Sequence, residues 1–259
     1  MSAYVVPALV ALFVWWFATG VVLLLDGLPR RSYRWSLGVA GALALAGLAV
    51  AATTADDATP TGAYVAFGAA LLVWGWLELS FLTGFLTGPR KLAAEPGCSE
   101  TRRFVHATEA VLYQDLALLA GFALIAALTW RQANTMAVST FAVLWVMRLS
   151  AKLNLFLGVR NLSEEFLPRH LAYLQGYFRR RRMNGLLPVS LLAAGAVAVS
   201  LAQGAMAARA GSFEATQLTL VATLLVLGIA EHLFMVLPFS AGALWRWWLG
   251  KEHLGVPIR

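Results

Sequence analysis

The sequence has 259 residues, of which 60% are hydrophobic and only 13% are charged. Its mean hydropathy of +0.71 excludes an ordinary soluble globular domain and is typical of a multi-span membrane protein. The net charge of +7 does not indicate nucleic-acid binding, because the basic residues lie almost wholly between the apolar runs, where membrane topology explains them. The single cysteine, Cys98, excludes an internal disulfide framework.

Seven apolar runs are each long enough to cross the hydrocarbon core of a bilayer, which takes about 20 helical residues. They are residues 4–25, 35–54, 62–87, 105–130, 135–159, 186–208 and 216–242. The sequence therefore predicts an all-α fold, a single polytopic domain of seven transmembrane helices over residues 1–259. Basic residues follow the first run rather than precede it, so we expect no cleaved signal peptide there.

Lys and Arg are concentrated after the first, third and fifth runs and in the C-terminal tail. Because cytoplasmic loops carry the excess of basic residues, this pattern predicts an N-terminus outside and a cytoplasmic C-terminus. Residues 244–248, LWRWW, are typical of an interfacial anchor that ends the last run.

The longest polar stretch, residues 160–185, separates the fifth and sixth runs. Its apolar residues recur at helical spacing, and it ends in four consecutive basic residues, Arg179, Arg180, Arg181 and Arg182. This pattern predicts an interfacial amphipathic helix whose basic end binds anionic membrane lipids. The alternative is a solvated basic loop that only enforces topology.

Ionisable residues interrupt four of the predicted spans. They are Glu78 in the third, His106, Glu109 and Asp115 in the fourth, Arg148 and Lys152 in the fifth, and Glu231 and His232 in the seventh. A charge at mid-membrane costs about 3 kcal/mol, so each is by default a functional-site hypothesis. At about 1.5 Å of rise per residue, one charged residue on each of the four spans falls about 20–24 Å from the outer surface: Glu78, Glu109, Arg148 and Glu231. We therefore expect a shared polar pocket near the cytoplasmic side.

The residues leave several roles open for this pocket. Four acids face two bases, and a divalent Fe, Zn or Mn ion could neutralise the excess. The candidate metal ligands are Glu78, His106, Glu109, Glu231 and His232, and His106 and His232 could instead ligate the central metal of a tetrapyrrole cofactor. Alternatively, Arg148 and Lys152 act only as charge partners, in Glu78–Arg148 or Glu231–Lys152 ion pairs that hold the helices in register. A proton or ion pathway is the third alternative, and no catalytic residue is assigned.

Three runs carry a family resemblance. Residues 74–90 (WGWLELSFLTGFLTGPR), 151–185 (AKLNLFLGVRNLSEEFLPRHLAYLQGYFRRRRMNG) and 230–245 (AEHLFMVLPFSAGALW) resemble the photosynthetic complex assembly protein PuhE family of purple phototrophic bacteria. The resemblance covers nearly the whole chain, and the long middle run is its most specific part.

The resemblance implies a factor of the bacterial cytoplasmic or intracytoplasmic membrane that acts in reaction-centre and light-harvesting complex assembly or modulates bacteriochlorophyll production. Reaction-centre subunits, light-harvesting subunits and bacteriochlorophyll enzymes are the implied partners. The family has no assigned catalytic residues to carry over. The alternative function is a membrane-embedded, metal-dependent oxidoreductase that acts on a pigment precursor.

Overall fold

A computed structural model describes residues 2–162, 164 and 167–237 of the chain. Its long helices are α1 (Ser2–Asp26), α2 (Tyr33–Thr53), α3 (Pro60–Leu82), α4 (Glu100–Leu128), α5 (Met136–Leu157), α6 (Leu186–Ala207) and α7 (Phe213–Phe234). Two short 3-10 helices, η1 (Arg30–Ser32) and η3 (Arg169–Tyr177), lie in the connections. In the described part of the chain seven helices are long and apolar enough to cross a membrane, which confirms the prediction of seven apolar helices.

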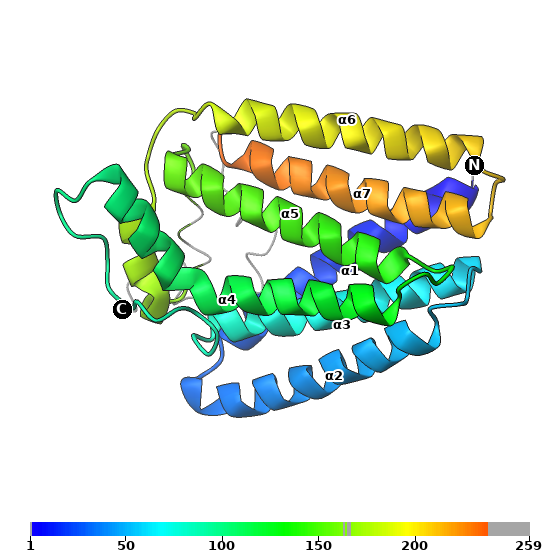
Figure 1. Cartoon of the computed structure of the whole chain (residues 1–259), viewed down its shortest axis with the longest axis horizontal. Coiled ribbons are helices and arrows are strands. Elements are labelled where there is room, and N and C mark those ends of the chain that lie inside the picture. Colours follow the sequence, from blue (N-terminus) through cyan, green and yellow to red (C-terminus); the bar gives the residue numbers. More distant parts are fainter. Residues whose placement is uncertain (1, 163, 165–166, 238–259) are drawn as a thin grey trace, which may run out of the picture.

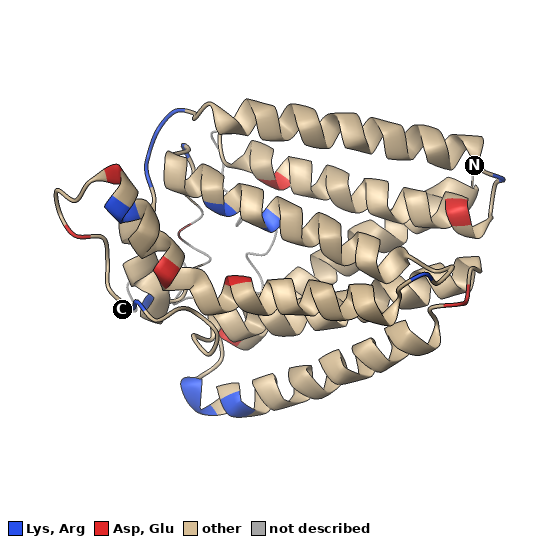
Figure 2. Ribbon diagram, in the orientation of Figure 1, with Lys and Arg blue, Asp and Glu red and all other residues tan. Residues whose placement is uncertain are grey.

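The seven helices form one bundle around α3, and they run along a common direction (Figure 1). α3 packs against α1, α2, α4, α5 and α7, and half of the residues in its most apolar stretch are buried. The core around it contains Phe67, Leu118, Phe141 and Leu220. Lys and Arg gather mainly at the end of the bundle where α1, α3 and α5 finish (Figure 2), and we call this the basic end.

The connection after α3 folds back against α4 instead of continuing the helix. α3 ends at Leu82 rather than at residue 87, because Gly84 takes a positive φ of 79° that reverses the chain. The backbone N–H of Leu86 then donates to the carbonyl of Ser80 at 2.8 Å. The expected third span was therefore too long at its end.

This returning segment is inserted against the backbone of α4. The N–H of Gln114, inside α4, donates to the carbonyl of Thr87 at 3.0 Å. Gly88 lies so close to α4 that an added Cβ would stand 1.9 Å from the Glu109 carbonyl oxygen. A carbonyl from outside the helix at this point gives a physical reason for the bend of α4 seen in Figure 1.

Two helices begin earlier than the hydropathy runs predicted because serine side chains cap them. Ser99 accepts from the N–H of Arg102 at 3.3 Å, so α4 begins at Glu100 instead of residue 105. Ser212 accepts from the N–H of Ala215 at 3.2 Å, so α7 begins at Phe213 instead of residue 216. Beyond Phe234, the predicted end of the last span at residue 242 and the anchor at 244–248 lie outside the described residues.

The helix expected in residues 160–185 differs in form from the prediction. The long helical segment among its described residues is the 3-10 helix η3 at residues 169–177, and its Leu171 and Leu174 are buried against Phe81 and Ala110. These leucines therefore pack on α3 and α4. The four arginines lie after η3, outside any helix: Arg179 pairs with Glu100, Arg180 pairs with Glu164 at 3.0 Å, and Arg181 and Arg182 are exposed.

One buried arginine ties η3 to two helices at the basic end. Arg103, 7% exposed, donates to the carbonyls of Tyr177 at 2.7 Å and Phe156 at 3.1 Å. Its guanidinium also lies 3.9 Å from the centre of the Phe156 ring. Because these carbonyls end η3 and α5, Arg103 on α4 joins three elements with one side chain.

His170 fixes the turn after α3 from the side of η3. Its Nε2–H donates to the carbonyl of Leu82 at 2.7 Å, and its ring lies against Gly84. Burial lowers the pKa of the His170 imidazole below its ordinary value of 6.5, and the nearby Arg30 and Lys91 lower this pKa further. The folded protein therefore holds a neutral imidazole at this position.

Replacement of Gly88 by alanine is expected to destabilise the bundle by about 3 kcal/mol, the upper range for overpacking, because the new methyl group would meet α4 backbone that cannot rotate away. The measurement is thermal unfolding of the purified protein in detergent. Gly68→Ala is the matched control, since nothing lies within 4 Å of its added Cβ, and it should leave the midpoint unchanged or raise it. Equal midpoints for the two variants would contradict the close approach.

Acidification is expected to lower the stability of the wild-type protein through His170. Because the pKa of this imidazole is lowered on folding, its stabilising contribution is complete above the ordinary value of 6.5 and is lost as the pH falls below it. The measurement compares thermal midpoints of wild type and His170→Gln between pH 8 and about pH 5, a range that spans the ordinary pKa of histidine. The wild-type midpoint should fall more steeply, and parallel curves would refute this assignment.

Candidate functional site

The polar groups of the membrane-spanning core are organised by α5. Arg148 and Lys152 are four residues apart and share one face of this helix. Ser150 and Asn154 share a second face, about 200° around the helix from the first. α5 therefore presents cations to one set of neighbours and neutral hydrogen-bonding groups to another.

The cationic face of α5 meets one acid from α3 and one from α4. Arg148 lies 2.8 Å from Glu78 of α3, and Lys152 pairs with Asp115 of α4. Both cations lie 5.8 Å from the centre of the Phe81 ring, so the two pairs form one cluster, which we call the α5 charge cluster. Figure 2 shows charged positions along α3, α4 and α5 between the two ends of the bundle. The cluster is electrically balanced, with two acids and two bases.

The Glu78–Arg148 contact is a single charged hydrogen-bond contact and not a bidentate one. Among the described residues, Oε1 of Glu78 and Nε of Arg148 are buried and have no hydrogen-bond partner. Their side chains are 15% and 32% exposed, so the pair is held in a largely apolar environment. Removal of one partner would leave the other charge uncompensated there.

Glu231 lies beside this cluster but bonds elsewhere. Its carboxylate accepts a hydrogen bond from Nε1 of Trp15 at 3.0 Å, which joins α7 to α1. Glu231 is close enough to Arg148 and Glu78 for electrostatic interaction with both, and its side chain lies on the exposed side of α7. The Glu231–Lys152 pair considered from the sequence is wrong, because Lys152 pairs with Asp115.

His232 belongs to a second polar group, on the neutral face of α5. It is 1% exposed; Nδ1 lies 2.9 Å from the carbonyl of Gly228 and Nε2 lies 2.9 Å from Oγ of Ser150. Because a carbonyl oxygen can only accept, Nδ1 carries the proton and Nε2 accepts from the serine. Ser150 also contacts Ser190 at 3.0 Å, so this group joins α5, α6 and α7. The Nε2 lone pair of His232 is thereby used within the protein.

Two of the polar residues predicted in the first half of α4, His106 and Glu109, lie apart from both groups. His106 is 8% exposed, and its Nδ1 has no hydrogen-bond partner among the described residues. Glu109 is partly exposed, its backbone lies against Gly88, and its side chain makes no hydrogen bond or ion pair within the described part. Across residues 2–162, 164 and 167–237, no three His, Cys, Asp or Glu side chains are grouped as a metal ion requires. The geometry does not favour the predicted five-residue metal site.

The structure separates the four acids that the sequence placed in one pocket. Glu78 and Asp115 each pair with a cation, whereas Glu231 accepts from the neutral Trp15 N–H and Glu109 lies near the turn that follows α3. The four acids therefore do not share one point.

Two buried polar residues were missed by the sequence analysis. Gln114 and Ser80 are 0% exposed, and the amide atoms of Gln114 and the hydroxyl of Ser80 have no hydrogen-bond partner among the described residues. The returning segment connects them, since Leu86 bonds to the carbonyl of Ser80 and Thr87 to the N–H of Gln114. The sequence signal for Gln114 was a glutamine inside an apolar run. It was missed because the predicted pocket was built from ionisable residues.

Comparison with known proteins shows to which family this chain belongs. The family described as "Protein of unknown function (DUF3623)" matches residues 1–254. The chain belongs to this family. A Rhodobacter capsulatus relative, described as "Uncharacterized 30.4 kDa protein in puhA 5'region", is 38% identical over 250 residues, which cover 93% of this chain and 89% of the relative. No solved structure matches the chain. The DUF3623 match extends across all seven helices.

A double-mutant cycle on Glu78 and Arg148 is expected to show coupling. Glu78→Gln and Arg148→Gln should each destabilise by about 3 kcal/mol, because each leaves its partner charged and unpaired. The double variant should cost about 1–3 kcal/mol less than the sum of the two. Denaturation of the purified protein in detergent measures the three values.

The control cycle pairs Glu78→Gln with Arg209→Gln. Arg209 is exposed in the connection between α6 and α7, so the two effects should add within about 0.5 kcal/mol. Additive effects of Glu78→Gln and Arg148→Gln would show that their contact contributes nothing.

Proposed function

We propose that this protein is a multi-pass membrane factor that supports the assembly of photosynthetic reaction-centre and light-harvesting complexes or modulates bacteriochlorophyll production. The observation that carries the proposal is the 38% identity to the Rhodobacter capsulatus protein described by its position 5' of puhA. That position gives the relative a photosynthesis-related setting, and the resemblance of residues 74–90, 151–185 and 230–245 to the PuhE family adds the assembly role.

The arrangement of polar groups supports a structural factor over a metal-dependent oxidoreductase. The α5 charge cluster is balanced by its own side chains, and His232 is hydrogen-bonded on both nitrogens. These groups hold α3, α4, α5, α6 and α7 in defined rotations, which is what a rigid platform for other membrane subunits requires. No observation on the described residues favours the oxidoreductase.

The proposed orientation places the basic end in the cytoplasm. The distribution of Lys and Arg in Figure 2 supports this under the positive-inside rule. The proposed location is the bacterial cytoplasmic or intracytoplasmic membrane. In this orientation the exposed Arg181 and Arg182 face the anionic leaflet surface or the cytoplasmic parts of partner subunits.

The test is complementation in a purple phototrophic bacterium that lacks its own copy of this protein. Loss of the protein is expected to lower the absorbance of pigment–protein complexes in isolated membranes, and the wild-type chain should restore it. Unchanged absorbance without the protein would refute the proposed function.

The variant Glu231→Gln with His232→Ala separates the assembly role from an enzymatic one. As long as the variant accumulates in the membrane, an assembly factor should still restore the complexes, and chromatography of extracted pigments should show no precursor. Build-up of one precursor at normal protein levels would instead indicate an enzyme. Immunodetection of the variant in the same membranes is the control for accumulation.

A further inference from the structure

α2 packs along α3 and approaches it most closely near Gly47, and the two helices separate toward the basic end (Figure 1). A Cβ added at Gly47 would lie 2.7 Å from the carbonyl oxygen of Ala69, so the two backbones are nearly in contact there. Six residues earlier, a Cβ added at Gly41 would lie 3.2 Å from Nε1 of the Trp76 indole. A Cβ added at Gly38 would have no atom within 4 Å. Because the large Trp76 side chain takes the place of a close backbone contact, the space between the helices widens toward the start of α2.

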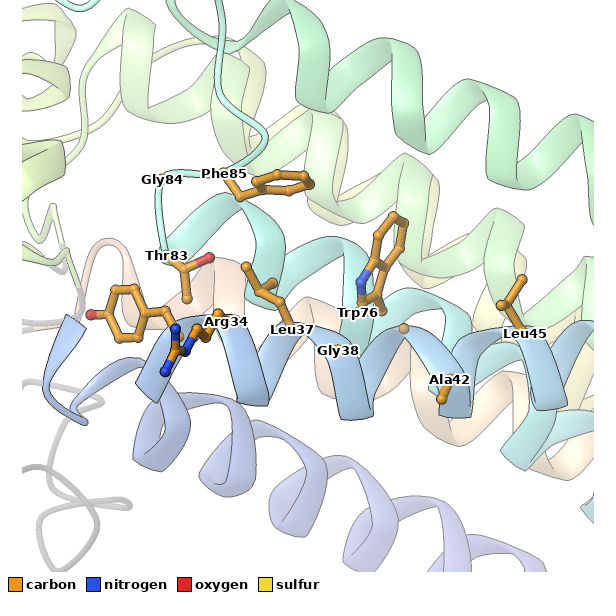
Figure 3. Close-up of a pocket in the computed structure, with 11 residues that line it drawn as sticks. Arg34, Leu37, Gly38, Ala42, Leu45, Trp76, Thr83, Gly84 and Phe85 are labelled. Carbon is orange, nitrogen blue, oxygen red and sulfur yellow. The ribbon is translucent and has the colours of Figure 1, made fainter. Parts of the chain in front are cut away.

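This widening forms an open groove of about 760 Å³ between α2 and the end of α3. Along α2 it is lined by Leu37, Gly38, Ala42 and Leu45, and on the opposite side by Trp76 and Phe85 (Figure 3). Its volume lies within the range of about 300–1,000 Å³ that is typical of ligand sites. The wall is almost wholly apolar, so the occupant must be apolar along most of its length.

Arg34 lines the groove at the basic end (Figure 3). Its guanidinium lies 5.3 Å from the centre of the exposed Trp35 ring, and it makes no ion pair with the described residues. Arg30 and Arg31 precede it in η1, and none of the described residues that line the groove is acidic. Arginine beside an exposed tryptophan is typical of the headgroup level, where an unpaired guanidinium is complementary to a phosphate.

The length of the groove matches one leaflet. Arg34 and Leu45 are eleven residues apart on α2, which is about 16 Å along the helix. Half of the hydrocarbon core of a bilayer measures about 15 Å. A lipid of one leaflet whose charged headgroup lies at Arg34 is therefore long enough for its acyl chain to reach Leu45.

We propose that this groove binds one anionic phospholipid, with its phosphate on Arg34 and one acyl chain along Gly38, Ala42 and Leu45. The small side chains of α2 leave room for the chain, and Trp76 and Phe85 close the far side. The charge of Arg34 selects an anionic headgroup over a zwitterionic one, which carries its own cation.

The test is native mass spectrometry of the full-length protein in detergent, titrated with phosphatidylglycerol or with phosphatidylcholine. Wild type is expected to bind one phosphatidylglycerol with at least tenfold preference, and higher ionic strength should weaken that binding. Arg34→Gln should lower phosphatidylglycerol affinity about tenfold, whereas the matched change Arg31→Gln, outside the groove, should leave it nearly unchanged.

A second pair of variants tests the apolar part. Ala42→Phe fills the groove and should lower the affinity for phosphatidylglycerol, whereas Val39→Phe, exposed on the same helix but outside the groove, should not. Equal binding of both lipids by wild type, or unchanged binding by both Arg34→Gln and Ala42→Phe, would overturn the proposal. A protein dimer that Ala42→Phe dissociates and phosphatidylglycerol does not displace would also overturn it, because the groove would then hold a second copy of the chain.

Discussion

The arrangement of this bundle depends on the need to neutralise two cations inside an apolar layer. Arg148 and Lys152 both project from one face of α5, and their side chains are 32% and 19% exposed. Glu78 and Asp115 supply the counter-charges from α3 and α4, so these helices can take only the rotations that bring their acids to α5. The opposite face of α5 holds α6 and α7 through Ser150, Ser190 and His232. One helix therefore sets the orientation of its neighbours.

The connection after α3 extends this organisation to the basic end. Because α3 stops at Leu82, the returning segment can lie against α4, and η3 covers both with Leu171 and Leu174. Arg103 and His170 then tie η3 to α4, α5 and the end of α3. α2 takes no part in these contacts; it packs along α3, most closely near Gly47, and an open groove lies between the two helices toward the basic end.

These features fit a protein that serves as a platform in the membrane. The charges of the α5 charge cluster are compensated by its own side chains, while the outside of the bundle carries a basic end and a groove of about the length of one leaflet. An anionic lipid held in that groove would bring its headgroup to Arg34 at the basic end, where a partner subunit could contact protein and lipid together. The proposed assembly role and the proposed lipid site are thus compatible, although each rests on separate observations.

Seven apolar helices could be predicted from the sequence because hydropathy over about 20 residues is a local property. Ionisable residues of α3, α4, α5 and α7 could likewise be recognised as unusual, since each is costly in lipid wherever its partner lies. Most of them lie in or beside the two polar groups, but His106 and Glu109 lie apart from both. Which acid meets which base could not be predicted: Lys152 takes Asp115 and not Glu231, because the choice depends on helix rotations that many distant contacts set together. For the same reason η3, with the spacing of an interfacial helix, buries its leucines in the protein, and only the tertiary structure provided that partner surface.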